Sequence, residues 1–139
     1  MAIYPRILAT LDGSDIDLPM LEQVKLLATM LGSTVVLLRV AHYHTRDSRT
    51  AEETDCQADL ARAAARLEGH GFEVETVLGR GEPAAEILRQ AEAQHASLIA
   101  MGTHGHGRVS RYLYGSVSEQ VRHSAALPLL LVRGHDIAG

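Results

Sequence analysis

The chain has 139 residues, of which 46% are hydrophobic, and a formal net charge of −4. This length accommodates one domain with a real hydrophobic core that needs no disulfide staples. The 13 Lys and Arg residues are scattered and outnumbered by 17 Asp and Glu residues, which argues against binding to a nucleic-acid backbone.

Hydrophobic stretches of two kinds alternate along the chain. Short apolar or alternating runs that stop at turn residues are typical of strands, and apolar residues spaced three or four apart are typical of helices. In chain order the pattern predicts a strand at 3–11, a helix from Pro19 to Gly32, a strand at 34–41, a loop at 42–50, a helix at 51–68, a strand at 72–78, a turn at 79–83, a helix at 83–94, a strand at 97–101, a glycine-rich loop, a helix at 117–124 and a strand at 127–132.

This βαβαβαβαβ order predicts an α/β fold, an open parallel sheet with helices on both faces. Neither a repeat nor a linker interrupts the chain, so we expect a single domain over residues 1–139. Ligands of such folds bind beyond the carboxyl ends of the strands. Asp12 ends the first strand and the glycine-rich loop follows the fourth, so the two meet in one cleft if those strands are neighbours.

The glycine-rich loop is the most informative segment of the sequence. Its glycines let the backbone adopt positive φ angles and approach a ligand closely. The pair Gly115-Ser116 is placed where a helix begins, and free N–H groups and the positive end of the helix dipole favour an anion there. The loop therefore predicts a site for nucleotide phosphates, although such a triplet also occurs in plain tight turns. The triplet comprises Gly102, Gly105 and Gly107.

Side chains near these motifs leave alternatives open. The loop carries His104, His106, Arg108 and Arg111, but no lysine, so neither the Walker pattern nor the dinucleotide fingerprint fits. Asp12 taken alone is more typical of a turn former or helix cap than of a binding residue, and the expected proximity of the loop reverses this preference. We expect Ser14 to cap the first helix rather than to act as a nucleophile, because no Gly-x-Ser-x-Gly elbow surrounds it.

The cysteine, histidine and hydropathy patterns argue against a disulfide-bonded, a zinc-binding and a membrane-inserted protein. Cys56 is the only cysteine, which excludes an internal disulfide. The pairs His42-x-His44 and His104-x-His106 could offer four imidazoles to zinc, but no carboxylate–histidine pattern supports such a site and we assign no metal ligands. No apolar run approaches the ~18 residues of a membrane span, and no signal peptide is recognised, so we expect a cytoplasmic protein without membrane insertion.

Five segments together resemble the universal stress proteins. They are Ile7-Leu8-Ala9-Thr10-Leu11-Asp12-Gly13-Ser14, Leu37-Leu38-Arg39-Val40, Gly81-Glu82-Pro83-Ala84, Met101-Gly102-Thr103-His104-Gly105 through Gly115-Ser116-Val117, and Leu127-Pro128-Leu129-Leu130-Leu131-Val132. The fourth segment matches the G-x2-G-x9-G-S/T signature of the ATP-binding members. The resemblance spans nearly the whole chain and is loosest between residues 42 and 55.

The resemblance implies a Rossmann-like fold of the HUP type with strand order 3-2-1-4-5. Asp12 and the backbone around Val40 would hold adenine and ribose, and the backbone amides of Gly115, Ser116 and Val117 would hold the phosphates. Mg²⁺ would be bound mainly by phosphate oxygens. The implied binding residues are Thr10, Leu11, Asp12, Val40, Met101, Gly102, His104, Gly105, His106, Gly107, Arg108, Gly115, Ser116, Val117 and Ser118.

We therefore expect an ATP- or ADP-binding regulatory stress protein. It would act as a nucleotide-dependent switch for a partner protein, such as a transporter, a kinase or a metabolic enzyme. A slow ATPase and a nucleotide-independent interaction module are the alternatives; we name no catalytic residue, because phosphoryl transfer needs more positioned groups than the sequence offers. A flavin module is disfavoured by the single Phe and the absence of Trp. The resemblance also implies a homodimer through the strand at 127–133, with higher oligomers open.

Overall fold

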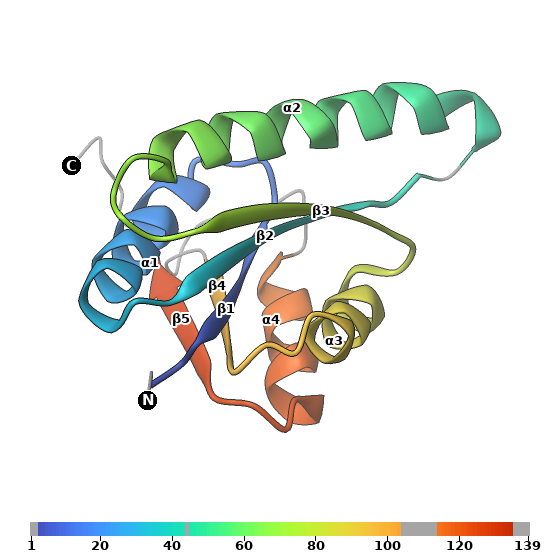
Figure 1. Ribbon diagram of the computed structural model, residues 1–139. Coiled ribbons are helices and arrows are strands. Elements are labelled where there is room, and N and C mark those ends of the chain that lie inside the picture. Colours follow the sequence, from blue (N-terminus) through green and yellow to red (C-terminus); the bar gives the residue numbers. More distant parts are fainter. Residues whose placement is uncertain (1–2, 44, 104–113, 135–139) are drawn as a thin grey trace.

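The computed structural model describes residues 3–43, 45–103 and 114–134. These form a five-stranded parallel sheet and the helices that cover it (Figure 1). No helix in the described ranges is long and apolar enough to cross a lipid bilayer. The elements are β1 (Arg6–Leu11), α1 (Asp17–Leu31), β2 (Thr34–Ala41), the short 3-10 helix η1 (Arg46–Ser48), α2 (Arg49–Leu67), β3 (Val74–Arg80), α3 (Pro83–Ala93), β4 (Leu98–Thr103), α4 (Tyr114–Ser124) and β5 (Leu129–Arg133).

The sheet order is β3-β2-β1-β4-β5, which confirms the expected fold and strand order. All four strand pairs are parallel. The chain starts in the middle of the sheet, builds outward through β2 and β3, and then crosses over to build β4 and β5 on the other side of β1. The first and fourth strands are therefore neighbours, which is the condition under which the two predicted motifs can meet.

Side chains of the central strands form an apolar layer on each face of the sheet. In β1, Ile7 and Ala9 pack toward α1 and α2, whereas Leu8 packs toward α3 and α4. The same alternation in β2 places Leu37 on the first face and Leu38 on the second. Strands buried on both faces need apolar residues at every position, which explains the near-continuous hydrophobic runs in the sequence. Figure 1 shows α2 over one face and α3 and α4 over the other.

Several predicted boundaries were wrong by a few residues. The first strand begins at Arg6 instead of Ile3, and the last begins at Leu129 instead of Leu127. The predicted turn at 79–83 is partly strand, because β3 stays paired with β2 as far as the partners Ala41 and Arg80. The predicted loop at 42–50 contains η1 and the first residues of α2. The fourth helix begins at Tyr114, three residues before its predicted start.

The core on the α3–α4 face should be sensitive to truncation at Ile99. This β4 side chain is fully buried and its strand pairs on both sides, with Leu8 and Leu129 as register partners. We expect Ile99→Ala to lower the free energy of unfolding by about 2–5 kcal/mol, because the removed atoms leave a cavity in a packed layer. Urea unfolding measures this as a lower midpoint with an unchanged slope.

The matched control is Met30→Ala, because Met30 on α1 is 79% exposed. Its free energy of unfolding should change by less than about 0.5 kcal/mol. Equal effects of the two substitutions would contradict the assignment of Ile99 to the core.

Candidate functional site

Asp12 leaves the carboxyl end of β1 and forms the turn into α1. Its side chain is only 3% exposed. Its Oδ1 accepts hydrogen bonds from the backbone N–H of Ser14 at 2.8 Å and from the Ser14 hydroxyl at 2.5 Å. A carboxylate that bonds the backbone two residues ahead is a local turn former. The turn-forming role that the sequence left open is therefore present, at a residue placed on the carboxyl edge of the sheet.

A second carboxylate, from Asp17, supports the same turn. Its Oδ1 accepts the backbone N–H of Asp12 at 3.0 Å, and its Oδ2 accepts that of Gly13 at 2.9 Å. Asp17 was not among the residues predicted from the sequence, although an acidic side chain in the first turn of a helix was a visible signal. The prediction that Ser14 caps the helix was wrong: Ile16 occupies the cap position, without a capping side chain.

The environment of Asp17 favours its neutral form. Burial and the neighbouring charge of Asp12 raise the pKa of Asp17 from 3.8 to about 7. The hydrogen bonds from the amides of Asp12 and Gly13 and the charge of Arg39 oppose this rise. The charge of Asp12 disfavours a second negative charge on Asp17, because like charges repel strongly in a site that is partly removed from water.

An ion pair lies directly beneath the turn. Arg39 of β2 donates from Nε to Oδ2 of Asp59 on α2 at 3.0 Å, and its Nη1 donates to the carbonyl of Val40 at 3.2 Å. A Cβ atom added to Gly13 would lie 2.8 Å from Asp59 Oδ2 and 2.9 Å from Arg39 Nη2. Gly13 also has a φ of +83°, so the turn needs glycine for both its conformation and its closeness to the pair.

The β4 side of the candidate site is held close to the same turn. A Cβ atom added to Gly102 would lie 2.6 Å from Cγ1 of Ile16 and 3.2 Å from its carbonyl oxygen. The first glycine of the signature is therefore required by packing against the β1–α1 connection. The close approach to phosphates that the sequence analysis assigned to Gly102 is a separate prediction, since this contact involves only the protein.

Other predicted residues in the strands have their side chains in the core. Thr10 is 1% exposed and lies beside its register partner Met101, which is fully buried. Leu11 is 3% and Val40 7% exposed. At these four positions a ligand at the edge of the sheet would be contacted through the backbone.

The start of α4 presents the remaining described residues of the signature. Because β4 and β5 are parallel, α4 runs back from the carboxyl edge, and its first turn lies at that edge. Gly115 is the second residue of this helix. Ser116 is exposed and its Oγ accepts a hydrogen bond from Gln120 at 3.3 Å, whereas Val117 and Ser118 are buried.

Five predicted residues, His104, Gly105, His106, Gly107 and Arg108, lie outside the described residues, and so does His44 of the weighed zinc pairs. His42 of those pairs places Nδ1 3.0 Å from the carbonyl oxygen of Gly81. Within the described ranges there is no group of three or more His, Cys, Asp or Glu side chains that could hold a metal ion.

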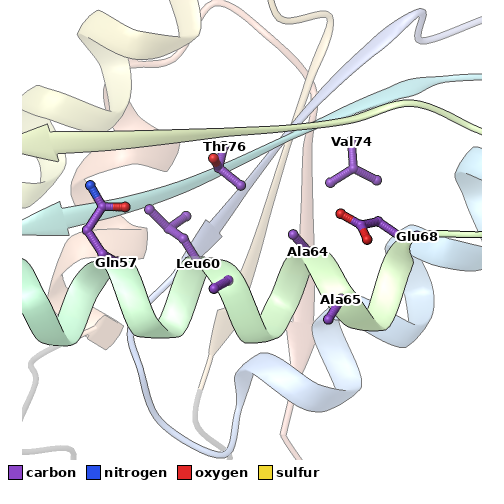
Figure 2. A pocket seen from close by; sticks show the side chains of 8 residues that line it. Gln57, Leu60, Ala64, Ala65, Glu68, Val74 and Thr76 are labelled. Atoms are coloured by element: carbon purple, nitrogen blue, oxygen red, sulfur yellow. The ribbon is translucent and has the colours of Figure 1, made fainter.

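A groove of about 380 Å³ lies elsewhere, between α2 and β3 (Figure 2). Apolar side chains, mostly alanine, line the middle of the groove, and Gln57 and Glu68 lie toward its two ends. None of the predicted site residues lines it. The complete lining is Gln57, Leu60, Ala61, Ala64, Ala65, Glu68, Val74 and Thr76.

Comparison with known proteins places the chain among characterised sequences and structures. Residues 3–133 match the family model described as the universal stress protein family. The chain is 30% identical to universal stress protein MJ0531 of Methanocaldococcus jannaschii, over 94% of this chain and 83% of that protein. It also matches the crystal structure of a universal stress protein family member from Burkholderia pseudomallei, with a TM-score of 0.78 and 26% identity, over 93% and 96% of the two chains.

Two similar structures were solved with a nucleotide. One is a universal stress protein in complex with cAMP, with 22% identity and a TM-score of 0.75, over 93% of this chain and 97% of that one. The other is the Archaeoglobus fulgidus universal stress protein in complex with dAMP, with 23% identity and a TM-score of 0.71, over 95% and 99%. At this identity the likeness supports the common fold.

Gly102→Ala should destabilise the ligand-free protein because the new methyl group collides with Ile16. We expect a loss of about 1–3 kcal/mol in the free energy of unfolding, typical of overpacking. Urea unfolding of Gly102→Ala, Ile16→Ala and the double variant closes a thermodynamic cycle. The double variant should lose less than the sum of the single losses, by at least ~0.5 kcal/mol. Strictly additive losses would show that the two residues do not compete for this space.

Proposed function

Because this chain belongs to the universal stress protein family, we propose that it binds an adenine nucleotide, ATP or ADP, and acts as a nucleotide-dependent switch for a partner protein. The observation that carries the proposal is the position of the signature. Its first glycine, Gly102, touches the connection that follows Asp12, and its last pair, Gly115-Ser116, lies in the first turn of α4.

In this proposal each side of the site has its own part in binding. Asp12 and the backbone at Val40 bind adenine and ribose from β1 and β2, as the family resemblance implies. The backbone amides of Gly115, Ser116 and Val117 bind phosphate oxygens, because the first N–H groups of a helix have no partner within the helix. The exposed Ser116 hydroxyl adds a further hydrogen bond. Mg²⁺, when bound, neutralises phosphate charge and is held mainly by the phosphate oxygens.

Two neighbouring complexes support adenine as the recognised base, since relatives of the same fold were solved with cAMP and with dAMP. The choice among ATP, ADP and AMP, the switch role and the partner are part of the proposal. An ATPase would be slow, because the sequence offers at most Asp12 and Arg108 as charged groups for phosphoryl transfer. A nucleotide-independent interaction module is the alternative that a lack of binding would favour.

We also propose a homodimer formed through β5. Within the described part of the chain β5 pairs only with β4, so its outer edge offers unpaired backbone groups. Leu131 on this strand is 39% exposed, and its neighbours Leu129 and Leu130 are half-buried. An apolar sheet edge is stabilised by pairing with a second copy. The cytoplasmic location expected from the sequence also stays a prediction.

Gly115→Val should abolish nucleotide binding. The branched side chain would occupy the place where phosphate approaches the first amides of α4. Isothermal titration with ATP and Mg²⁺ should give a dissociation constant raised at least about a hundredfold, a loss of roughly 2.7 kcal/mol. Ser116→Ala should weaken binding about three- to tenfold, since it removes one hydrogen bond. Mass analysis of small molecules released from the denatured wild type identifies the bound nucleotide.

The control is Ser124→Val, an exposed position at the opposite end of the same helix, which should retain wild-type affinity. Retained affinity in Gly115→Val would place the ligand elsewhere. A wild type that binds nothing at millimolar nucleotide would contradict the proposed function itself.

Leu131→Lys should convert the proposed dimer into a monomer, because an ammonium group at a paired sheet edge would be desolvated. Light scattering at micromolar concentration should change from twice 15.0 kDa to 15.0 kDa. Leu26→Lys is the control, since Leu26 is 54% exposed and belongs to the helix α1 rather than to the edge strand. A monomeric wild type would contradict the dimer.

A further inference from the structure

The β1–α1 turn depends on a carboxylate that lies outside the family signature. Asp17 reaches back from the first turn of α1 and accepts two successive backbone amides, those of Asp12 and Gly13, one on each oxygen. Asp12 is the residue through which the proposed site binds the adenosine part of the ligand. The main-chain position of Asp12 is thus held by the side chain of Asp17.

We infer that Asp17 is a positioning residue for the adenine-nucleotide site: its ionised carboxylate fixes the turn that carries Asp12, and protonation of Asp17 loosens the turn and weakens nucleotide binding. This inference rests on the proposed nucleotide-binding function. It adds to the site a residue outside the glycine signature, and it makes the affinity for nucleotide depend on pH.

The hydrogen-bond geometry gives the ionised form its role. Both oxygens of a carboxylate are strong acceptors, and each amide bond to a charged acceptor is stronger than one to a neutral group. Protonation turns one oxygen into a donor and weakens the bond that it accepts. The backbone amides of Asp12 and Gly13, now 3.0 and 2.9 Å from the Asp17 oxygens, are then held less tightly. The Asp12 side chain moves with its backbone. Small shifts of a binding group lower affinity when the site is otherwise rigid.

The charged groups around Asp17 place its titration near neutrality. Asp12 faces it from the turn, and Arg39 faces it from β2, while Arg39 is itself paired with Asp59 of α2. Burial and the charge of Asp12 raise the pKa of Asp17 to about 7, and Arg39 limits the rise. Asp17 is therefore mostly neutral below this pH and mostly ionised above it, so the turn tightens as pH rises.

The test compares the affinity for cyclic AMP at pH 6 and pH 8 by isothermal titration. Cyclic AMP is the probe because its phosphodiester has no second proton, whereas a phosphate monoester titrates near pH 6. With a pKa of about 7, the ionised fraction of Asp17 falls about tenfold between pH 8 and pH 6. If only the ionised form binds well, the wild-type dissociation constant should rise by up to about tenfold over this range.

Asp17→Asn keeps the shape of the side chain but offers one acceptor and an NH₂ group that faces a backbone amide. This variant should bind cyclic AMP more weakly than the wild type at pH 8, and its affinity should be nearly the same at both pH values. The matched control is Asp15→Asn, the same change at an exposed position in the same turn, which should keep the wild-type pH profile.

A second readout needs no ligand, and its first measurement uses the wild type alone. In ¹⁵N–¹H spectra of the ligand-free wild type, the Asp12 and Gly13 amide signals should shift with a common midpoint near pH 7. The shift should persist in Asp15→Asn and vanish in Asp17→Asn. Amide signals that stay constant between pH 5 and pH 9 would overturn the inference even if the Asp17→Asn variant fails to fold.

The outcomes separate the two proposals. Binding of cyclic AMP with equal affinity at pH 6 and pH 8, or a pH profile that Asp17→Asn retains, overturns the role of Asp17 and leaves the nucleotide site standing. If neither cyclic AMP nor ATP with Mg²⁺ binds at any pH, the proposed function fails, and the role of Asp17 in nucleotide binding fails with it.

Discussion

The pairing of β1 with β2 on one side and with β4 on the other decides where every candidate functional group lies. Through this pairing the turn after β1 and the loop after β4 leave the sheet at the same edge, although they are some 90 residues apart in the chain, as the contact between Thr10 and the Ala100 carbonyl illustrates. Parallel strands need a crossover connection, so the parallel pairing of β4 and β5 also sets the direction of α4 and brings its first turn to this edge. The fold and the site are consequences of one arrangement of the sheet.

Close packing at this edge of the sheet requires glycine at two positions, whether or not a ligand is bound. Gly102 leaves no room for a side chain because Ile16 lies against it, and Gly13 leaves none because the Arg39–Asp59 pair lies beneath it. Glycine at these places allows side chains of neighbouring segments to pack directly against the backbone. A glycine signature of this kind thus has two physical causes, a fold that requires close approach and a ligand that would use the same closeness.

The electrostatics of the edge differ from those of the rest of the described surface, where most ion pairs are exposed and of small energetic weight. Here the buried carboxylate of Asp12 and the half-buried carboxylate of Asp17 share one turn, next to the half-buried ion pair of Arg39 and Asp59. Such an arrangement is costly for stability, and perturbed pKa values of this size are concentrated at functional sites. Arg39 links both features, because it pairs with Asp59 and lowers the cost of charge on Asp17.

Periodicity and turn residues were enough to predict the alternation of strands and helices, and the family resemblance supplied the strand order and the nucleotide hypothesis. Boundaries were missed where tertiary contacts extend an element: β3 continues through Gly79 and Arg80 because β2 supplies partners for them. Ser14 was expected to cap α1, but Ile16 occupies the cap position, and the Ser14 hydroxyl donates to the carboxylate of Asp12 and accepts the backbone N–H of Ile16 at 3.4 Å.

The sequence by itself determined the fold class and the two motifs, because hydrophobic spacing and glycine placement are local properties of the chain. Only the tertiary structure decided that Arg39 pairs with Asp59 and that Ile16 requires Gly102 to lack a side chain. These contacts depend on how β1, β2, β4 and α2 are placed in space, and their energies arise from burial and closeness that no spacing along the chain encodes.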